Sequence, residues 1–362
     1  MAAIDVLFQE MLDSGASDLH IAEGNPPRLR LHGKVVPVQG WAPLESEQIR
    51  AMMAEICDEK RFAKFEECGD MDFAYQYENK ARFRCNFNKQ YTGYGAVFRT
   101  IPSKILTLEQ LKVPEVLETF AEFVSGMVLV TGPTGSGKST TLAAVIDHIN
   151  SNYARHILTI EEPIEFVHPH KKSTIVQREV HIDCHSFSDG LKSSTRQDFD
   201  VVLVGEMRDL ETISLAVTAA EMGVLVFGTL HTNSAIKTVD RIIDVFPSDQ
   251  QPAIRAMLSV SLKAVCAQLL LKTADGKGRR AANEIMIQNR AISNYIREGK
   301  TNQIAQVIMS GRAQGMQLMD DAIEGYLREG VITAEEAYMK ALDKHRFLSY
   351  MQGKSLPAGA LE

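Results

Sequence analysis

The chain has 362 residues, of which 45% are apolar and 23% are charged, and its formal net charge is −7. These values are typical of a globular protein with enough chain for two hydrophobic cores. The acidic balance argues against a nucleic-acid partner, because binding the phosphates of DNA or RNA requires a basic surface. Five cysteines are scattered without a C-x-x-C pair, so neither a zinc site nor a disulfide framework is expected.

Residues 1–100 predict a small α+β domain with a largely antiparallel sheet. Its opening stretch, MAAIDVLFQEMLDSG, places apolar residues on one face of a helix. We then expect a strand in SDLHIA, a two-residue hairpin in RLRLHGKVVPV, a helix near residues 45 to 66, and strands in DFAYQY, ARFRCNFNKQ and GAVFRTI. In ARFRCNFNKQ the strand period of two puts Arg82 and Arg84 on one face and Phe83 on the other. From spacing alone, the arginine pair indicates either a solvated face or a cation offered to a phosphate site.

A linker is expected at residues 101–115, where a T-x-x-Q capping box at Thr107 lies in a segment flanked by prolines. Residues 116–362 then predict an α/β domain, because the apolar runs GMVLVTG, HILTIEEP, STIVQREV, DVVLVGE and GVLVFGTLH alternate with helical stretches. Such runs indicate a mostly parallel sheet covered on both faces. From residue 250 the pattern is mainly helical, interrupted by a hairpin, and a capping box at Thr333 opens a last helix. No apolar stretch approaches the roughly 18 residues of a membrane span, so a membrane role requires partners.

A phosphate-binding loop is predicted in VTGPTGSGKSTT, residues 130–141, which fits G-x-x-x-x-G-K-[ST]. An apolar strand precedes the loop and an amphipathic helix follows it, as the motif requires. Glycines there let backbone N–H groups approach the phosphates of ATP closely. The expected nucleotide-binding residues are Gly132, Pro133, Thr134, Gly135, Ser136, Gly137, Lys138, Ser139 and Thr140.

The remaining catalytic groups are expected where the parallel strands end, which is the edge at which α/β sheets bind ligands. Lys138 suits the β and γ phosphates, and Ser139 suits Mg²⁺. Glu206, which ends VVLVGE, is the candidate for orienting the attacking water, and Glu161, which ends ILTIE, the candidate for holding Mg²⁺. Each glutamate could instead cap a helix or form an ion pair. His231 could contact the γ-phosphate, or its ring could be satisfied by a backbone carbonyl.

Taken together, the motifs are highly specific. The chain resembles the type IV pilus retraction ATPases of the PilT family, within the secretion ATPases that form hexameric rings. The stretches that carry the resemblance are SDLHI, GAVFRTIPSKILTLEQL, VLVTGPTGSGKSTTLAA, HILTIEEPIEFVH, QREVHIDCHSF, DVVLVGEMRDLETI, FGTLHTNSA, RIIDVFP, AANEIMI and GMQLMDDAI. They cover nearly the whole chain.

The resemblance implies a PAS-like N-terminal domain followed by a RecA-like P-loop ATPase domain with C-terminal helices. It also implies a homo-hexamer that uses ATP and Mg²⁺ to power pilus retraction and twitching motility. In this family, arginines matching Arg82, Arg84 and Arg99 reach toward nucleotide, some from across the subunit boundary. The expected partners are an inner-membrane platform protein like PilC and other pilus ATPases. The expected location is cytoplasmic, peripheral to the inner membrane at the pilus base.

Four positions depart from the family pattern. The resemblance maps the family's acidic box onto Glu161 and Glu162, which read Glu-Glu where the family commonly has Glu-Asp. Thr92 stands near a position where many relatives carry arginine. The retraction-linked segment reads AISNYIRE, with Ser293 and Tyr295 in place of arginine and leucine. These departures leave an accessory retraction motor open as the main alternative.

Other classes of function are less well supported by the motifs. A pilus extension or type II secretion ATPase would share the core, but those relatives usually carry an extra N-terminal domain and a four-cysteine zinc insertion, neither of which the pattern suggests. A small-molecule kinase would need an acceptor pocket or lid. A regulatory protein without hydrolysis would not require Lys138, Ser139 and Glu206 together.

Overall fold

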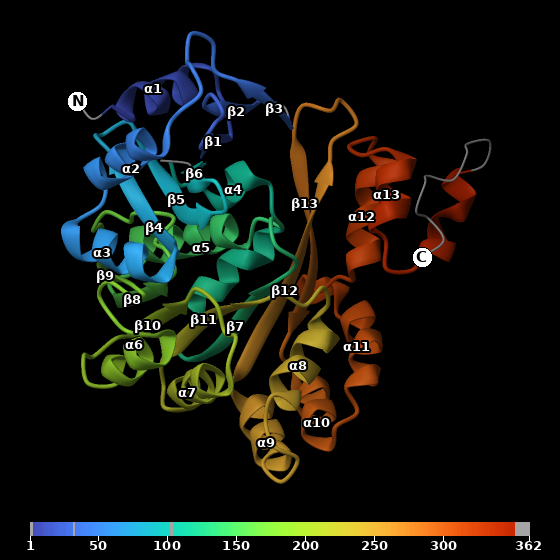
Figure 1. Cartoon of the computed structure of the whole chain (residues 1–362). Coiled ribbons are helices and arrows are strands. Elements are labelled where there is room, and N and C mark those ends of the chain that lie inside the picture. The colour runs from blue at the N-terminus through green and yellow to red at the C-terminus, as the bar shows by residue number, and fades with distance from the viewer. Residues whose placement is uncertain (1–2, 32, 102–103, 352–362) are drawn as a thin grey trace. The chain divides into compact units, whose positions relative to one another are not determined.

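The computed structural model describes residues 3–31, 33–101 and 104–351. Its helices and strands divide into two compact units (Figure 1). Unit 1 contains Met1–Lys104 and Glu162–Val167, and unit 2 contains Ile105–Glu161 and His168–Glu362. A short segment from the middle of the chain therefore belongs to the N-terminal unit.

Unit 1 is built on a six-stranded antiparallel sheet in the order β3-β2-β1-β6-β5-β4. Its elements are α1 (Asp5–Asp13), β1 (Asp18–Ala22), β2 (Arg28–Leu31), β3 (Lys34–Pro37), α2 (Ser46–Glu55), α3 (Glu59–Cys68), β4 (Asp70–Tyr77), β5 (Ala81–Gln90) and β6 (Gly93–Ile101). Along β5 buried and partly exposed residues alternate, as the period of two predicts. Phe83 points into the core, where its ring stacks on Phe8 at 4.4 Å between centroids.

The helix predicted near residues 45 to 66 is two helices, so that expectation was wrong. α2 opens with a capping box between Glu45 and Gln48 and ends at Glu55. Asp58 then starts α3, because its carboxylate accepts a hydrogen bond from the backbone N–H of Arg61. An aspartate at that position satisfies an otherwise unpaired donor of a new helix, which favours a restart over continuation.

Unit 2 contains a seven-stranded sheet in the order β13-β12-β7-β11-β10-β8-β9 (Figure 1). All neighbouring strands are parallel except β13, which pairs antiparallel with β12. The elements up to the hairpin are α4 (Leu108–Leu111), η1 (Glu115–Glu122), β7 (Gly126–Thr131), α5 (Lys138–Asn152), β8 (His156–Glu161), β9 (Thr174–Glu179), α6 (Phe187–Ser194), β10 (Val201–Val204), α7 (Leu210–Glu221), β11 (Leu225–Leu230), α8 (Ala235–Asp244), α9 (Gln251–Ser261), β12 (Leu262–Lys272) and β13 (Arg279–Ile287).

The central strands of unit 2 are buried on both faces. Every residue of β7, β10 and β11 is buried. One core cluster joins the sheet to α4, η1 and α5, and another joins it to α6, α7, α8 and α9. This arrangement confirms the predicted parallel sheet covered by helices on two sides.

The C-terminal region is helical, as expected. It comprises α10 (Arg290–Glu298), η2 (Thr301–Gln303), α11 (Ile304–Ser310), η3 (Arg312–Gln314), α12 (Met319–Arg328), α13 (Ala334–Lys340) and η4 (Lys344–Met351). Thr333 accepts a hydrogen bond from the N–H of Glu336, but the Glu336 carboxylate accepts from the N–H of Lys272 at 3.0 Å. The predicted capping box is therefore half formed, because the glutamate ties α13 to β12. The helix it opens is followed by η4, so it is not the last.

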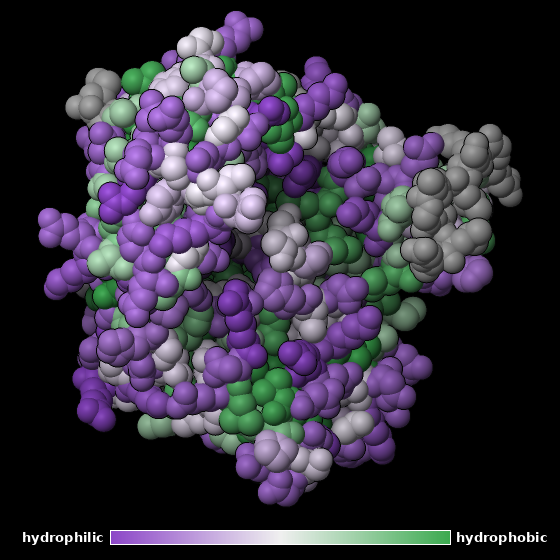
Figure 2. Space-filling model, in the orientation of Figure 1, coloured by the Kyte–Doolittle hydropathy of each residue, from purple (hydrophilic) through white to green (hydrophobic). Residues whose placement is uncertain are grey.

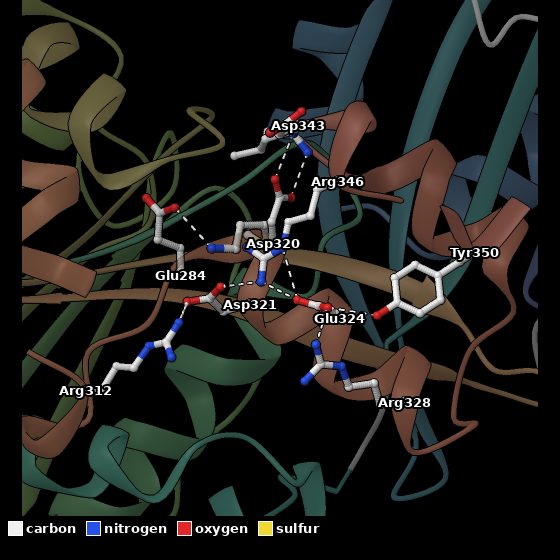
Figure 3. A network of polar contacts seen from close by, with 11 residues as sticks. Glu284, Arg312, Asp320, Asp321, Glu324, Arg328, Asp343, Arg346 and Tyr350 are labelled. Carbon is white, nitrogen blue, oxygen red and sulfur yellow. Dashed lines mark hydrogen bonds and ion pairs between the residues drawn. The ribbon is translucent and has the colours of Figure 1, made fainter. Parts of the chain in front are cut away.

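A network of charged side chains holds α12 to η4 (Figure 3). Glu324 accepts hydrogen bonds from Arg328 at 2.5 Å, from the hydroxyl of Tyr350 at 2.9 Å and from Arg346 Nε at 3.0 Å. Arg346 also pairs with Asp321 of α12 at 2.7 Å. Because Glu324 and Asp321 share one arginine, the end of the described chain is tied to α12 at two points.

The face of the molecule shown in Figure 2 is mostly hydrophilic, with hydrophobic side chains exposed in smaller areas. Within the described residues, none of the helices combines the length and apolarity needed to cross a membrane.

Candidate nucleotide-binding site

Four adjacent strands of unit 2 bring the predicted site residues to one edge of the sheet. β7, β11, β10 and β8 lie side by side and run parallel (Figure 1), so their carboxyl ends share an edge. The loop that begins at Gly132 follows β7, and His231 follows β11. Glu206 comes two residues after β10, and Glu161 is the last residue of β8.

The phosphate loop has the backbone conformation that its glycines allow. Gly132, Gly135 and Gly137 have φ angles of 145°, 77° and 86°, which side chains with a Cβ rarely adopt. Lys138 begins α5, and its ammonium group donates to the carbonyl oxygens of Gly132 at 2.7 Å and Pro133 at 3.1 Å. The loop therefore combines a helix N-terminus with a cation, which is a favourable arrangement for binding phosphate.

Glu206 and His231 are in direct contact. Nε2 of His231 lies 2.8 Å from Oε1 of Glu206. Because a carboxylate can only accept, the imidazole carries its hydrogen on Nε2 in this contact. The contact places a carboxylate, and not a backbone carbonyl, at this ring nitrogen. It forms because β10 and β11 are neighbours in the sheet.

Arg208 is a third member of this cluster, and the sequence reasoning missed it. Its Nη2 donates to Oε2 of Glu206 at 2.6 Å. Burial raises the pKa of Glu206, but the hydrogen bonds from Arg208 and His231 outweigh burial and hold that pKa below its ordinary value of 4.5. Glu206 is therefore ionised at neutral pH. The signal that could have found Arg208 is its position two residues after Glu206, the glutamate that follows the apolar run VVLVG.

Two uncharged side chains are among the partners of Glu161. It accepts hydrogen bonds from the hydroxyl of Thr159 at 2.6 Å and from the amide of Gln177 at 3.3 Å. Carboxylate and hydroxyl oxygens are the hard ligands that Mg²⁺ prefers, so the donor set of Glu161 and Ser139 is chemically suited to that ion. Gln177 lies on β9, which pairs with β8, and nothing in its sequence neighbourhood marks it.

The three candidate arginines all lie in unit 1, on the sheet face opposite the core. Arg84 and Arg99 are directly opposite each other on β5 and β6. Arg99 pairs with the buried carboxylate of Asp18 at 2.8 Å. Arg82 donates to the carbonyl of Ile164 at 3.0 Å, within the same unit. The structure thus gathers the arginines on one surface, and gathers Lys138 and Glu206 with their neighbours on the sheet edge of unit 2.

Residues 1–354 match the model of a protein family described as Type II/IV secretion system protein. The chain is 52% identical over 327 residues to the Type IV pilus retractation ATPase PilT of Pseudomonas aeruginosa, a match that covers 90% of this chain and 94% of that protein. It is 40% identical over 335 residues to the Type IV pilus ATPase PilU of the same organism, covering 92% and 87%. A crystal structure of the pilus retraction motor PilT with bound ADP matches with a TM-score of 0.88 and 40% identity, covering 95% of this chain and 98% of that one.

These matches confirm the resemblance that the ordered motifs indicated, and the structural match confirms the predicted fold class. The agreement extends over both units, because the matched family model runs through nearly the whole chain. The chain belongs to the family of type II/IV secretion system proteins.

Proposed function

We propose that this protein is an ATPase motor that powers type IV pilus retraction and twitching motility. One observation carries the proposal. The phosphate loop with Lys138, the ionised Glu206 and its partner His231 meet at one sheet edge, because they follow the neighbouring strands β7, β10 and β11. The chain that carries them matches a pilus retraction ATPase over 90% of its length.

The chain's own residues supply each part of the chemistry. Loop N–H groups and Lys138 bind the phosphates of ATP, and Glu206 orients the attacking water. Ser139 and Glu161 would hold Mg²⁺, which when bound neutralises charge on the phosphate oxygens. His231 keeps the carboxylate of Glu206 in place through its 2.8 Å contact and is available to contact the γ-phosphate.

The cation for the transition state comes from unit 1. Arg82, Arg84 and Arg99 lie on the sheet face opposite the core, where Arg82 and Arg84 are half-buried and Arg99 is exposed. We propose that they reach the nucleotide from the same or a neighbouring subunit. The active form is a homo-hexamer, located in the cytoplasm at the base of the pilus. Its changes of shape act on an inner-membrane platform protein, so that pilin subunits return to the membrane.

An accessory retraction motor is the second candidate. It is favoured by the 40% identity to PilU and by Ser293 and Tyr295 on α10, in the segment linked to retraction. The higher identity to PilT, 52%, supports the principal role.

A deletion strain tests the proposal. Cells lacking the protein should extend pili without retracting them, which gives more surface pili and no twitching. Bald cells would point to an extension motor, and normal retraction would favour the accessory role.

Complementation makes the test specific to the proposed chemistry. The parental gene should restore twitching, whereas Lys138→Ala and Glu206→Gln should not. Glu211→Gln is a matched control, because it removes an exposed carboxylate that pairs with Lys192 on the surface. That variant should restore twitching as well as the parent does.

A further inference from the structure

A buried amide on β12 contacts the phosphate loop from behind. Gln268 is 1% exposed, although the residues around it in AQLLL are apolar. Its Nε2 donates to the carbonyl oxygen of Ser136 in the loop at 2.7 Å. Its Oε1 accepts from the hydroxyl of Thr141, near the start of α5, at 2.8 Å. One side chain therefore bonds both the loop and the helix that follows it.

A second buried amide fixes the orientation of the first. Asn283 lies directly opposite Gln268 on β13, and its Nδ2 donates to Oε1 of Gln268 at 3.0 Å. Since the carbonyl oxygen of Ser136 can only accept, the end of the Gln268 amide that faces it is the NH₂ group, and the end that faces Thr141 and Asn283 is the oxygen.

β12 also lies against both ends of the loop, with its backbone at Gly132 and with the side chain of Gln268 at Gly137. A Cβ added at Gly132 would lie 2.2 Å from the carbonyl oxygen of Gln268, and one added at Gly137 would lie 3.0 Å from its Nε2. β12 runs parallel to β7 beside it, with Ala267 opposite Thr131. Only glycine fits at position 132 with this strand in place.

The hydrogen bond to Ser136 determines where the next N–H points. In a planar trans peptide the carbonyl and the following N–H point in opposite directions. Holding the carbonyl of Ser136 toward β12 therefore aims the N–H of Gly137 away from β12, to the open side of the loop. Backbone N–H groups in such loops bind phosphate.

We propose that Gln268, held by Asn283, is a positioning residue that orients the Ser136–Gly137 peptide for binding the nucleotide phosphates. The inference deepens the proposed ATPase function and rests on it. Gln268 acts through the loop and does not itself touch the nucleotide.

The test measures ADP affinity and ATP turnover in the full-length protein. Gln268→Met keeps the length of the side chain and removes both ends of the amide. Loss of one such hydrogen bond should raise the Kd for ADP and the KM for ATP about 3- to 10-fold. Gln268→Glu keeps an acceptor for Thr141 and Asn283, but its ionised carboxylate cannot donate to Ser136. At a pH above the pKa of that buried carboxyl, the variant should therefore weaken ADP binding at least as much.

The matched control is Asn150→Leu, which removes another fully buried amide of unit 2. Asn150 bonds Pro169 and Lys171 at the far end of α5. It should lower thermal stability while leaving the Kd for ADP within about twofold of the parent. An equal loss of ADP affinity in this control would overturn the positioning role, because general destabilisation would then explain both variants.

Variants of Thr141 keep the test decisive if the Gln268 variants fail to fold. Thr141→Val removes the hydroxyl that orients Gln268 and should raise the Kd for ADP. Thr141→Ser retains the hydroxyl and should bind ADP with the affinity of the parent. Parental affinity in Gln268→Met, or in Thr141→Val when Gln268→Met does not fold, would overturn the inference. If the parent itself binds no ADP, the proposed function fails instead.

Discussion

Glu206→Gln keeps the shape of the side chain but removes its negative charge. ATP binding should persist, because Lys138 and the loop are intact. Turnover should fall on the order of 10²-fold or more, because no carboxylate then orients the attacking water. Lys138→Ala should weaken both binding and turnover. Steady-state kinetics together with ADP titration separate the two effects.

The Glu211→Gln variant used in complementation also serves as the kinetic control. It should retain parental turnover, since its carboxylate lies on the surface of α7. Parental turnover in Glu206→Gln would show that this assignment is wrong and would make Glu161 the candidate for orienting water.

At the scale of elements, the tie between α12 and η4 predicts a pH dependence of stability. The hydrogen bond from Arg346, with further ones from Tyr350 and Arg328, lowers the pKa of Glu324 from 4.5 to about 2. A lowered pKa in the folded state means that this carboxylate stabilises the fold above pH 4.5. That contribution is lost as the pH falls through about 2.

Glu324→Gln should therefore lower the free energy of unfolding by about 1 kcal/mol at pH 7, a value in keeping with partly exposed ion pairs. The deficit should shrink between pH 4.5 and about 2, where the parental carboxylate also becomes neutral. Urea unfolding measured at several pH values follows the change, with Glu335→Gln on the exposed side of α13 as the control. A deficit that stays the same at pH 2 would assign the effect to the acceptor oxygen that the amide replaces with a donor, and not to the lost charge.

At the scale of the whole molecule, mixed assemblies test whether unit 1 acts on a neighbouring subunit. If Arg84 acts in trans, mixing Arg84→Ala with Lys138→Ala in equal amounts leaves about one site in four with an intact loop and an intact arginine. ATPase activity should then exceed that of either variant alone. Arg82→Ala and Arg99→Ala, each mixed with Lys138→Ala, identify which of the three arginines contributes.

The control mixture combines Lys138→Ala with Glu206→Gln. Both residues belong to unit 2 and serve the same site, so no mixed interface contains both intact. That mixture should stay inactive. Recovery there would indicate a contaminating ATPase activity. No recovery in verified mixed assemblies with any arginine variant would count against action in trans.

The sequence by itself determined the features that depend on neighbouring residues. The loop motif at Gly132 to Ser139 follows from local spacing, as does the alternation that puts Phe83 inside and Arg84 outside. Apolar runs long enough to be buried on both faces predicted the parallel sheet. The break between α2 and α3 could have been predicted too, because Asp58 is a local helix-start signal.

Only the tertiary structure decided which distant residues meet. Contact between Glu206 and His231 requires β10 and β11 to be neighbours, and the bond from Gln268 to Ser136 joins residues 132 positions apart. Strand order and register are set by packing of the whole unit, which no local pattern records. For the same reason a lone polar residue in AQLLL looks unremarkable in sequence, yet the fold places it directly behind the phosphate loop.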